Sequence, residues 1–298
     1  FVLDCSFFCY NLAMKKETIQ QRADIINKSL YYIYKYIDSD ITLDELAKMN
    51  HVSKFHYHRI FKEETGVNFS DMLTSIRLQK AANLLISNQH STITEIAGNC
   101  GYTSHSSFIK AFKKRFNYTP TQWKKGSYKE YSEKLLKGKY LKPLDLSADI
   151  KVRKEVRCAY IRHKGYNKNV KFTWEKLKAL AYELNIQDYK EIGFHHDNPS
   201  ITPLDDCKYI AAITIPYDVK IENRISTFIL PEALCEVFKY KGKYGDFINL
   251  IRYIHQDWIK DKGYEVTTQP CSVRYIKNHL VDDSKEFEIE VWVPIKVI

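Results

Sequence analysis

A duplication with a shift of about fifty residues is the feature that most constrains what this chain can fold into. The segment TLDELA at 42–47 matches TITEIA at 92–97. In each copy the threonine hydroxyl can accept a hydrogen bond from the first turn of a helix, and the glutamate three residues later can return one, which makes a capping box. The sequence therefore predicts that a capped helix begins at both places.

The duplication continues into a second helix in each copy. Its matching positions are Ser53, Arg59, Phe61 and Lys62 in the first copy and Ser104, Lys110, Phe112 and Lys113 in the second. A short capped helix, a tight turn and a second, serine-capped helix form a helix-turn-helix, so this motif is predicted twice. Two such motifs in one domain can enter successive major grooves of DNA, about 34 Å apart, without a dimer.

Apolar residues at helical spacing predict two further helices in the same half of the chain. The first is marked by Ile19, Ala23, Ile26, Leu30, Ile33 and Ile37, and the second by Met72, Leu73, Ile76, Leu84 and Leu85. Gly66 and Gly101 are typical of turns, and Pro120 is expected to end the second basic helix. This half is therefore predicted to be all-α.

Charge is distributed unevenly along the chain. The formal net charge is +10, and residues 14–130 hold 18 basic against 11 acidic residues, whereas residues 151–298 hold 24 against 21. Residues 105–125 contain six Lys and Arg and no acid. A basic helix can be no more than a solvated surface, but here the duplication, the caps and the turn residues agree with it. The pattern therefore favours DNA as the partner of the first half.

Composition divides the chain into four segments. Residues 1–13 are apolar but have no basic residues before the apolar run, unlike a signal peptide, so Met14 is interpreted as the natural start and 1–13 as upstream or added sequence. The alternative is an additional strand or arm. Residues 14–126 are predicted to form the double helix-turn-helix domain, and residues 127–150, charged and containing Pro143, a linker. Residues 151–298 are predicted to form a second domain.

The second half contains a repeat of its own. Residues 157–166 parallel 234–243, a helical pattern follows each, at 172–184 and 247–262, and each unit ends in a strand closed by a proline, Pro216 or Pro294. This arrangement predicts an α+β domain of two β-α-β-β units related by a pseudo-twofold axis. A concave cleft is expected where the two units meet, and ligands often bind in such clefts.

The helical motifs resemble the DNA-binding domain of the AraC/XylS family of transcription regulators. The matching segments are 53–66, 77–78, 93–97 and 101–116, followed by Thr119 and Pro120. Asn117 replaces the glycine usual after Phe116, but asparagine tolerates a left-handed backbone. By motif position, the resemblance implies that DNA is contacted by Lys54, Phe55, His58, Arg59, Lys62, His105, Ser106, Ser107, Ile109 and Lys110. Lys113 and Lys114 belong to the basic run and are expected near the phosphates.

These positions are not expected to act alike. Arg59 is the best candidate for reading a base, because its planar guanidinium suits guanine O6 and N7. His58 and His105 could read bases or contact phosphate. Phe55 could touch a thymine methyl group or be half-buried. The remaining large aromatic side chains are interpreted as core, namely Phe61, Phe108, Phe112 and Trp123.

The second half resembles the GyrI-like effector-binding domain found in Rob-type regulators. The matching segments are 163–165, 174–177, 193–199, 207–209, 263–265, Tyr275 and 290–294. The resemblance implies a cleft acid at Glu290, with Tyr275, Trp174 and Trp292 as walls, which would suit a small, amphipathic cation. Two alternatives remain open: Glu290 paired with Arg274 or a nearby lysine, and the tryptophans packed as core. Strand alternation also allows Glu288 to share the face of Glu290.

Other chemistry has little support in the sequence. There is no Cys-x-x-Cys, and neither His56-x-His58 nor His195-His196 has the further ligands that zinc needs nearby. Ser106 beside His105 resembles no nucleophile elbow, and glycine-rich phosphate loops are absent. No metal or cofactor is expected. No apolar run approaches the ~18 residues of a spanning helix. Seven scattered cysteines favour a reducing, cytoplasmic location.

The sequence is therefore interpreted as that of a DNA-binding transcription regulator and not an enzyme, with activation expected by family analogy alone. Its expected partners are promoter DNA, RNA polymerase and a small-molecule effector, and it is expected to be a monomer or a weak dimer. A second hypothesis is a GyrI-like small-molecule hydrolase in which Glu290 acts as general base and Tyr275 as proton donor. A third is an architectural DNA-binding protein without a ligand.

Overall fold

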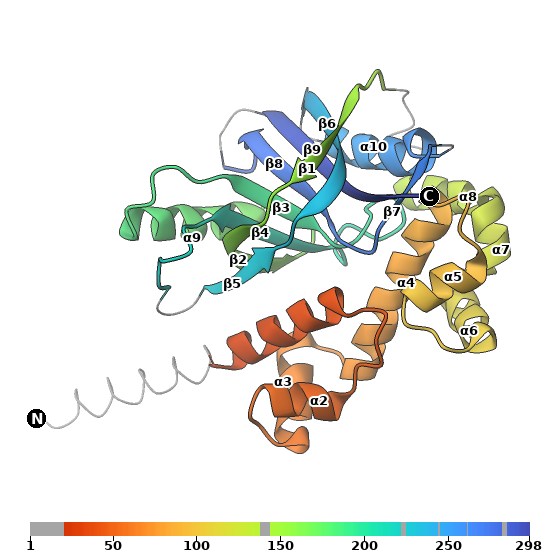
Figure 1. Ribbon diagram of the computed structural model, residues 1–298, viewed down its shortest axis with the longest axis horizontal. Helices are drawn as coiled ribbons and strands as arrows, with labels where there is room; N and C mark the ends of the chain where they lie inside the picture. The colour runs from red at the N-terminus through yellow and green to blue at the C-terminus, as the bar shows by residue number, and fades with distance from the viewer. Residues whose placement is uncertain (1–20, 138–143, 222–224, 244, 261, 282–284) are drawn as a thin grey trace, which may run out of the picture. The chain divides into compact units, whose positions relative to one another are not determined.

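The computed structural model describes residues 21–137, 144–221, 225–243, 245–260, 262–281 and 285–298 (Figure 1). The interpretation of residues 1–13 as upstream sequence lies outside these ranges. The chain forms two compact units. One contains the residues up to Ile76 together with Ile221–Ser226, and the other contains Arg77–Lys220 and Thr227–Ile298. The boundary between them falls inside one helix, α4 (Phe69–Ser87).

The first unit contains the first helix-turn-helix. Residues 21–35 are helical, and they are followed by α2 (Leu43–Met49), α3 (Lys54–Thr65) and the start of α4. Its core contains Ile26, Leu30, Ile33 and Ile37 of the predicted apolar stripe, packed with Leu46, Tyr57 and Phe61, whereas Ile19 of that stripe lies outside the described residues. Burial of this stripe explains why the periodicity of the sequence identified the helix correctly.

The second helix-turn-helix lies in the second unit. Its helices are α5 (Ile93–Asn99) and α6 (His105–Phe116), followed by α7 (Pro120–Gln122), a π-helical turn η1 (Trp123–Ser127) and α8 (Tyr128–Leu136). Trp123 is fully buried: its ring packs on Phe112 and Phe116, and its indole nitrogen donates to the Ala82 carbonyl at 3.1 Å. The predicted core role of Phe61, Phe108, Phe112 and Trp123 is confirmed.

The predicted helix starts are present in both copies. Thr42 with Glu45 and Thr92 with Glu95 form complete capping boxes, and Ser53 and Ser104 cap the second helices. Asn117 closes α6 in a left-handed conformation with φ 63°, as Gly66 closes α3 with φ 76°. The prediction that Pro120 ends the basic helix is wrong. Asn117 ends it, and Pro120 opens α7, where its missing N–H costs nothing.

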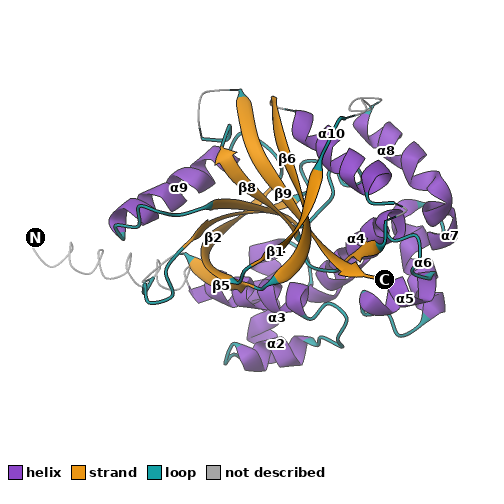
Figure 2. Ribbon diagram, turned by 45° about the horizontal axis from the view of Figure 1, so that its top comes forward, coloured by secondary structure: helices purple, strands orange, loops and turns teal. Residues whose placement is uncertain are grey.

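The remainder of the second unit is built on an antiparallel sheet (Figure 2). Its strand order is β1-β6-β9-β8-β3-β4-β2-β5, with β7 paired to β9. The strands are β1 (Ala148–Arg153), β2 (Val156–Lys164), β3 (Glu191–His195), β4 (Lys208–Thr214), β5 (Ser226–Leu230), β6 (Ala233–Lys243), β7 (Tyr264–Val266), β8 (Cys271–Lys277) and β9 (Glu286–Val297). The coarse prediction of a helical part followed by an α+β part is therefore confirmed.

Two helices pack on one face of this sheet (Figure 1). Helix α9 (Val170–Glu183) lies beside β2 and β4, and α10 (Asp246–Tyr253), continued by the π-helical turn η2 (Ile254–Trp258), lies beside β6. Both helices were predicted from their periodicity. Pro294 was expected to close the last strand, but β9 continues to Val297 and pairs there with β7. Within the described ranges, no helix combines the length and apolarity needed to cross a membrane.

The segment predicted as a linker carries regular structure at both of its ends. Helix α8 occupies Tyr128–Leu136, and β1 begins at Ala148. Gly126, with φ 119°, bends the chain between α7 and α8, a conformation that glycine adopts without strain. Tyr128 and Leu136 are buried, so α8 contributes to the packed unit.

The capping boxes make a testable contribution to stability. Thr92→Ala should lower the free energy of unfolding by about 1 kcal/mol, because the N–H of Glu95 then loses its acceptor. Thr92→Ser should retain most of the stability, because it keeps the hydroxyl. Urea denaturation of the full chain followed by circular dichroism measures both variants. Equal midpoints for the alanine and serine variants would show that the cap contributes nothing.

Candidate functional site

Helix α3 presents the five residues predicted for it on one surface. Lys54, Phe55, His58, Arg59 and Lys62 are all exposed and recur at the three- and four-residue spacing of one helix face. Phe55 is 81% exposed, so the alternative of a half-buried Phe55 is wrong. A nitrogen of the Arg59 guanidinium lies 3.2 Å from Nδ1 of His56, which holds the arginine close to its own helix.

Helix α6 presents a similar surface. His105, Ser106, Ser107 and Lys110 are exposed, and Ile109 is half-buried. Lys113 and Lys114 are exposed in the last turn, where positive charge also suits the negative end of the helix dipole. The opposite side of α6 buries Phe108, Phe112 and Phe116, so the helix is fixed by aromatic packing while its polar side stays accessible.

A cavity of about 140 Å³ lies where α9 and α10 meet the sheet. Its walls come from the segment before α9, the starts of α9 and α10, and the strands β3, β4 and β8 with the turn after β8. Most of the lining side chains are aromatic or aliphatic: Tyr166, Asn167, Val170, His195, Leu204, Tyr209, Gly245, Phe247, Ile248, Tyr275, His279 and Leu280. A concave, mainly apolar space with few polar groups is typical of a small-molecule site.

The aromatic walls of this cavity contact one another. Tyr166 meets His195 edge to face, with ring centroids 5.1 Å apart, and the Phe247 ring lies 4.5 Å from that of His195. The hydroxyl groups of Tyr209 and Tyr275 are hydrogen-bonded at 3.2 Å. Gly193 lies beneath these rings, because a Cβ there would come within 2.6 Å of the Tyr209 hydroxyl. Glycine is therefore required at this position for the two tyrosines to meet.

Burial keeps the titratable walls uncharged. Desolvation lowers the pKa of His195 to about 3, and the Tyr166 hydroxyl lies 2.6 Å from its Nδ1. Desolvation likewise raises the pKa of Tyr166, Tyr209 and Tyr275 above the ordinary range of tyrosine. At neutral pH these four side chains are therefore polar but without charge.

The four residues predicted to bind an effector do not lie together. Tyr275 lines the cavity, and Trp174 packs against it with ring centroids 5.5 Å apart. Glu290 faces the other side of the sheet, because it is paired in register with Arg274, the neighbour of Tyr275, and successive side chains of a strand point to opposite faces. There Glu290 accepts from Arg274 at 3.4 Å and from the Trp292 indole at 3.3 Å.

Sequence reasoning missed most of the cavity. His195 lies in a segment quoted for its family resemblance, but nothing in its pattern distinguished it from a core histidine. The sequence offered no reason to prefer Tyr166, Tyr209 and Phe247 as cavity residues over the other tyrosines and phenylalanines of the chain, which number 22 and 15 in all. Glu191 was also missed. This acid shares the cavity face of β3 with His195, and it is paired with Asn278 at 2.6 Å and with Lys178 at 3.2 Å.

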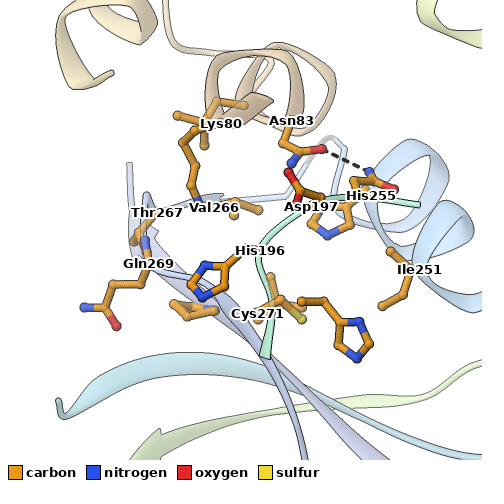
Figure 3. A pocket seen from close by; sticks show the side chains of 15 residues that line it. Lys80, Asn83, His196, Asp197, Ile251, His255, Val266, Thr267, Gln269 and Cys271 are labelled. Carbon is orange, nitrogen blue, oxygen red and sulfur yellow. Dashed lines mark hydrogen bonds between the residues drawn. The ribbon is translucent and has the colours of Figure 1, made fainter. Parts of the chain in front are cut away.

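A second, smaller cavity lies beside α4 (Figure 3). It measures about 40 Å³, room for a few water molecules. Lys80 and Asn83 enter it from α4, and His196, Asp197 and Gln269 are among its other walls. Burial lowers the pKa of the Lys80 ammonium group. His195 lines this cavity as well as the larger one.

Helix α4 is joined to the sheet part by buried polar contacts. The side-chain amide oxygen of Asn83 accepts from the side-chain amide nitrogen of Asn198 at 3.0 Å. The Ser87 hydroxyl lies 3.2 Å from Nδ1 of His255. The Asn88 side chain donates to the Val266 carbonyl at 2.9 Å and accepts from its N–H at 3.0 Å. Because buried polar groups are costly when unpaired, these bonds specify how the second helix-turn-helix packs on the sheet.

Two families of known domains match this chain, one in its helical part and one in its sheet part. Residues 148–296, half of the chain, match the family described as GyrI-like small molecule binding domain, and residues 46–126 match a helix-turn-helix domain family. The chain belongs to the AraC-type helix-turn-helix family and carries a GyrI-like domain. The cavity of about 140 Å³ lies entirely within the residues of this GyrI-like domain.

Individual relatives match the helical part of the chain. An uncharacterized HTH-type transcriptional regulator of Haemophilus influenzae is 34% identical over 34% of this chain and 33% of its own length. The transposon Tn10 TetD protein of Escherichia coli is 30% identical over 39% of this chain and 83% of its own length. The C-terminal domain of AraT, a response regulator from Geobacillus stearothermophilus, is 37% identical, covering 34% of this chain and 84% of that domain, with a TM-score of 0.33. The chain thus spans only about a third of the H. influenzae relative.

The buried histidines predict how stability depends on pH. Desolvation and the charge of Lys80 lower the pKa of His255 to about 4, so the native side chain stays neutral where the unfolded one takes up a proton. The contribution of His255 to the free energy of unfolding is therefore complete above pH ~6.5 and is lost as the pH falls towards about 4. The free energy of unfolding then falls by at most ~1.4 kcal/mol per pH unit. His255→Gln should flatten the decline of the urea midpoint between pH 7 and 5, whereas the exposed His105→Gln should not. An unchanged slope in His255→Gln would contradict this assignment.

Proposed function

We propose that this protein is a DNA-binding transcription regulator of the cytoplasm that responds to a small molecule and is not an enzyme. The observation that carries the proposal is the joining of two features in one compact unit: a helix-turn-helix with an exposed basic helix, and a GyrI-like domain with an aromatic cavity. The promoter DNA is read by α3 and α6, and the effector occupies the cavity of about 140 Å³.

Exposure and chemistry support different roles for the two basic surfaces. Arg59 reads a guanine through its guanidinium, and His58 or Phe55 adds a contact to a neighbouring base. Lys113 and Lys114 act on the phosphates without regard to sequence, because an ammonium group is a point charge on a flexible chain. Since α3 and α6 differ at most of the proposed contacts, with Lys110 at the position of Arg59, the site read by one chain is asymmetric.

The contacts of α4 support a route from effector to DNA. The segment from His195 to Ser200 begins at the effector cavity, and its Asn198 donates to Asn83 of α4. An effector that shifts His195 therefore acts on the helix that leads into the second helix-turn-helix. Such regulation requires that the effector bind two conformations with different affinity. By family analogy the response is activation, through contact with RNA polymerase, by a monomer or weak dimer.

The symmetry of the sheet supports the proposed origin of the cavity. The order β6-β9-β8 followed by β3-β4-β2 is the order expected for two β-α-β-β units related by a pseudo-twofold axis. Such an axis would pass between β8 and β3, which carry Tyr275 and His195 of the cavity wall. We therefore place the effector at the junction of the two units.

The two rival functions receive less support. Hydrolysis by Glu290 and Tyr275 requires both groups on one substrate, but these residues lie on opposite faces of the sheet. An architectural protein without a ligand would have no use for a cavity of about 140 Å³ in its sensor-like domain. The ion pair of Glu290 with Arg274 favours a structural role for that acid.

DNA binding by α3 and α6 gives the test of the proposed function. On a site selected from random DNA by the full chain, Arg59→Ala should lose about 1–3 kcal/mol of affinity and relax the preference at one base pair. Lys113→Ala should weaken specific and random DNA alike and reduce the salt slope by about one. Gel-shift titrations at several salt concentrations measure both. Equal losses on specific and random DNA for Arg59→Ala would contradict its role as base reader, and failure to select any site would contradict the proposed function.

We add to the proposed route a second contact between the sheet part and the second helix-turn-helix, made by Glu265. This acid is 3% exposed, and its carboxylate accepts from the N–H of Ser91 at 2.7 Å and from the Ser91 hydroxyl. Glu265→Gln can keep both hydrogen bonds, because the Ser91 hydroxyl can accept as well as donate, but it removes the negative charge that strengthens them, and should destabilise the unit by about 1 kcal/mol. Glu232→Gln, at an exposed position, is the control. Hydrogen exchange at Ser91 should accelerate only in Glu265→Gln, and unchanged exchange would exclude this contact from the route.

A further inference from the structure

We infer that the effector is a compact, uncharged aromatic molecule that carries one hydrogen-bonding group. The inference rests on the proposed function, because it assigns a chemical class to the ligand of the cavity between α9 and α10. It departs from the cationic effector that the sequence suggested. Four features support the inference: the volume of the cavity, the aromatic side chains that line it, the lack of charge on them, and the buried Nε2 of His195.

The volume of the cavity sets the size of the ligand. A cavity of about 150 Å³ lined by apolar side chains is large enough to bind benzene. The cavity here measures about 140 Å³, so it accepts one aromatic ring with a small substituent or a small fused pair of rings.

The walls favour an aromatic ligand over an aliphatic one. Tyr166 stands perpendicular to Tyr209, with an interplanar angle of 89°, and nearly perpendicular to His195, at 81°. Rings in these orientations present both edges and faces to the space between them. A planar aromatic guest can therefore make edge-to-face and stacked contacts at once, the arrangements that aromatic rings prefer.

The charges around the cavity argue against a cation. None of its described lining residues is an acid or a base that is charged at neutral pH, because burial lowers the pKa of His195 and of His279. Two acids lie close behind the walls, but both are already engaged: Glu191 by Lys178 and Asn278, and Asp197 by the N–H of Lys208 at 2.8 Å. A cation that enters the cavity gives up its hydration and gains only contacts with aromatic faces in return. An uncharged ring has little hydration to lose on entry.

The imidazole of His195, a lining residue, favours a ligand that carries a polar group. His195 Nδ1 is occupied by the Tyr166 hydroxyl, but its buried Nε2 has no hydrogen-bond partner within the part of the chain that the structure describes. Nε2 has almost no accessible surface in this conformation. A buried polar atom without a partner is costly, so a ligand that shifts the imidazole slightly and pairs with Nε2 gains affinity. A hydroxyl group on the ligand can donate or accept, and therefore suits either tautomer of the imidazole.

Calorimetry on the full chain with four probes tests this class. Phenol and indole are uncharged and polar, toluene is uncharged without a polar group, and phenyltrimethylammonium is a cation of similar size. Phenol or indole should bind at least about tenfold more tightly than the cation. His195→Phe should abolish the advantage of phenol over toluene, and His90→Phe, at an exposed position, should not.

A cavity-filling variant separates failure of this inference from failure of the proposed function. Leu280→Trp fills the cavity from a half-buried turn and should remove binding of each probe, whereas Ile276→Trp, exposed and outside the lining, should not. If the cation binds most tightly and Leu280→Trp removes it, the cavity is a ligand site but the inferred class is wrong. If no probe binds, or Leu280→Trp changes nothing, both the class and the proposed sensor role are contradicted.

Discussion

The hydrogen bonds between the end of α4 and strand β7 are the contacts on which the rest of this account depends. β7 pairs on one side with β9, and on its other side the Asn88 side chain satisfies both the N–H and the carbonyl of Val266. Glu265, the preceding residue, binds Ser91 just before the cap of α5. A sheet edge and a helix-turn-helix are thus joined by paired polar groups, which specify one arrangement better than apolar contact alone.

Side-chain alternation along the central strands decides what the GyrI-like domain can bind. Tyr275 and Arg274 are neighbours on β8, so one faces the helices and the other faces away. The helix face gathers tyrosines, His195 and Phe247 around the cavity, whereas the far face holds the ion pair of Arg274 with Glu290. The charges of Arg274 and Glu290 are therefore kept away from the cavity, and the space beneath α9 and α10 is apolar and aromatic.

Much of the helical part was predictable because its signals are local. A capping box, a left-handed Asn117 and an apolar stripe each depend on a few successive residues, and the structure contains all three. The error at Pro120 was also local, because a proline can end one helix or open the next. In the second half the internal repeat predicted both helices and the strands of two β-α-β-β units, but not β1, β5 or β7.

The cavity could not be predicted in the same way, because it depends on register. Whether Glu290 shares a face with Tyr275 is decided by the pairing of β8 with β9, which no spacing within either strand reveals. His195 gains its position from Tyr166 and Phe247, which are distant in sequence. The packing of α4 on the sheet likewise rests on bonds between residues more than a hundred positions apart, such as Asn83 with Asn198.

The central claim is that filling the cavity changes DNA binding through the packed second helix-turn-helix. The most direct measurement is the affinity of the full chain for its selected DNA site, with and without a saturating uncharged aromatic ligand, in the wild type and in Leu280→Trp. The account predicts that the ligand changes the DNA affinity of the wild type and leaves that of Leu280→Trp unchanged. An unchanged wild-type affinity, with calorimetry showing the cavity filled, would contradict it.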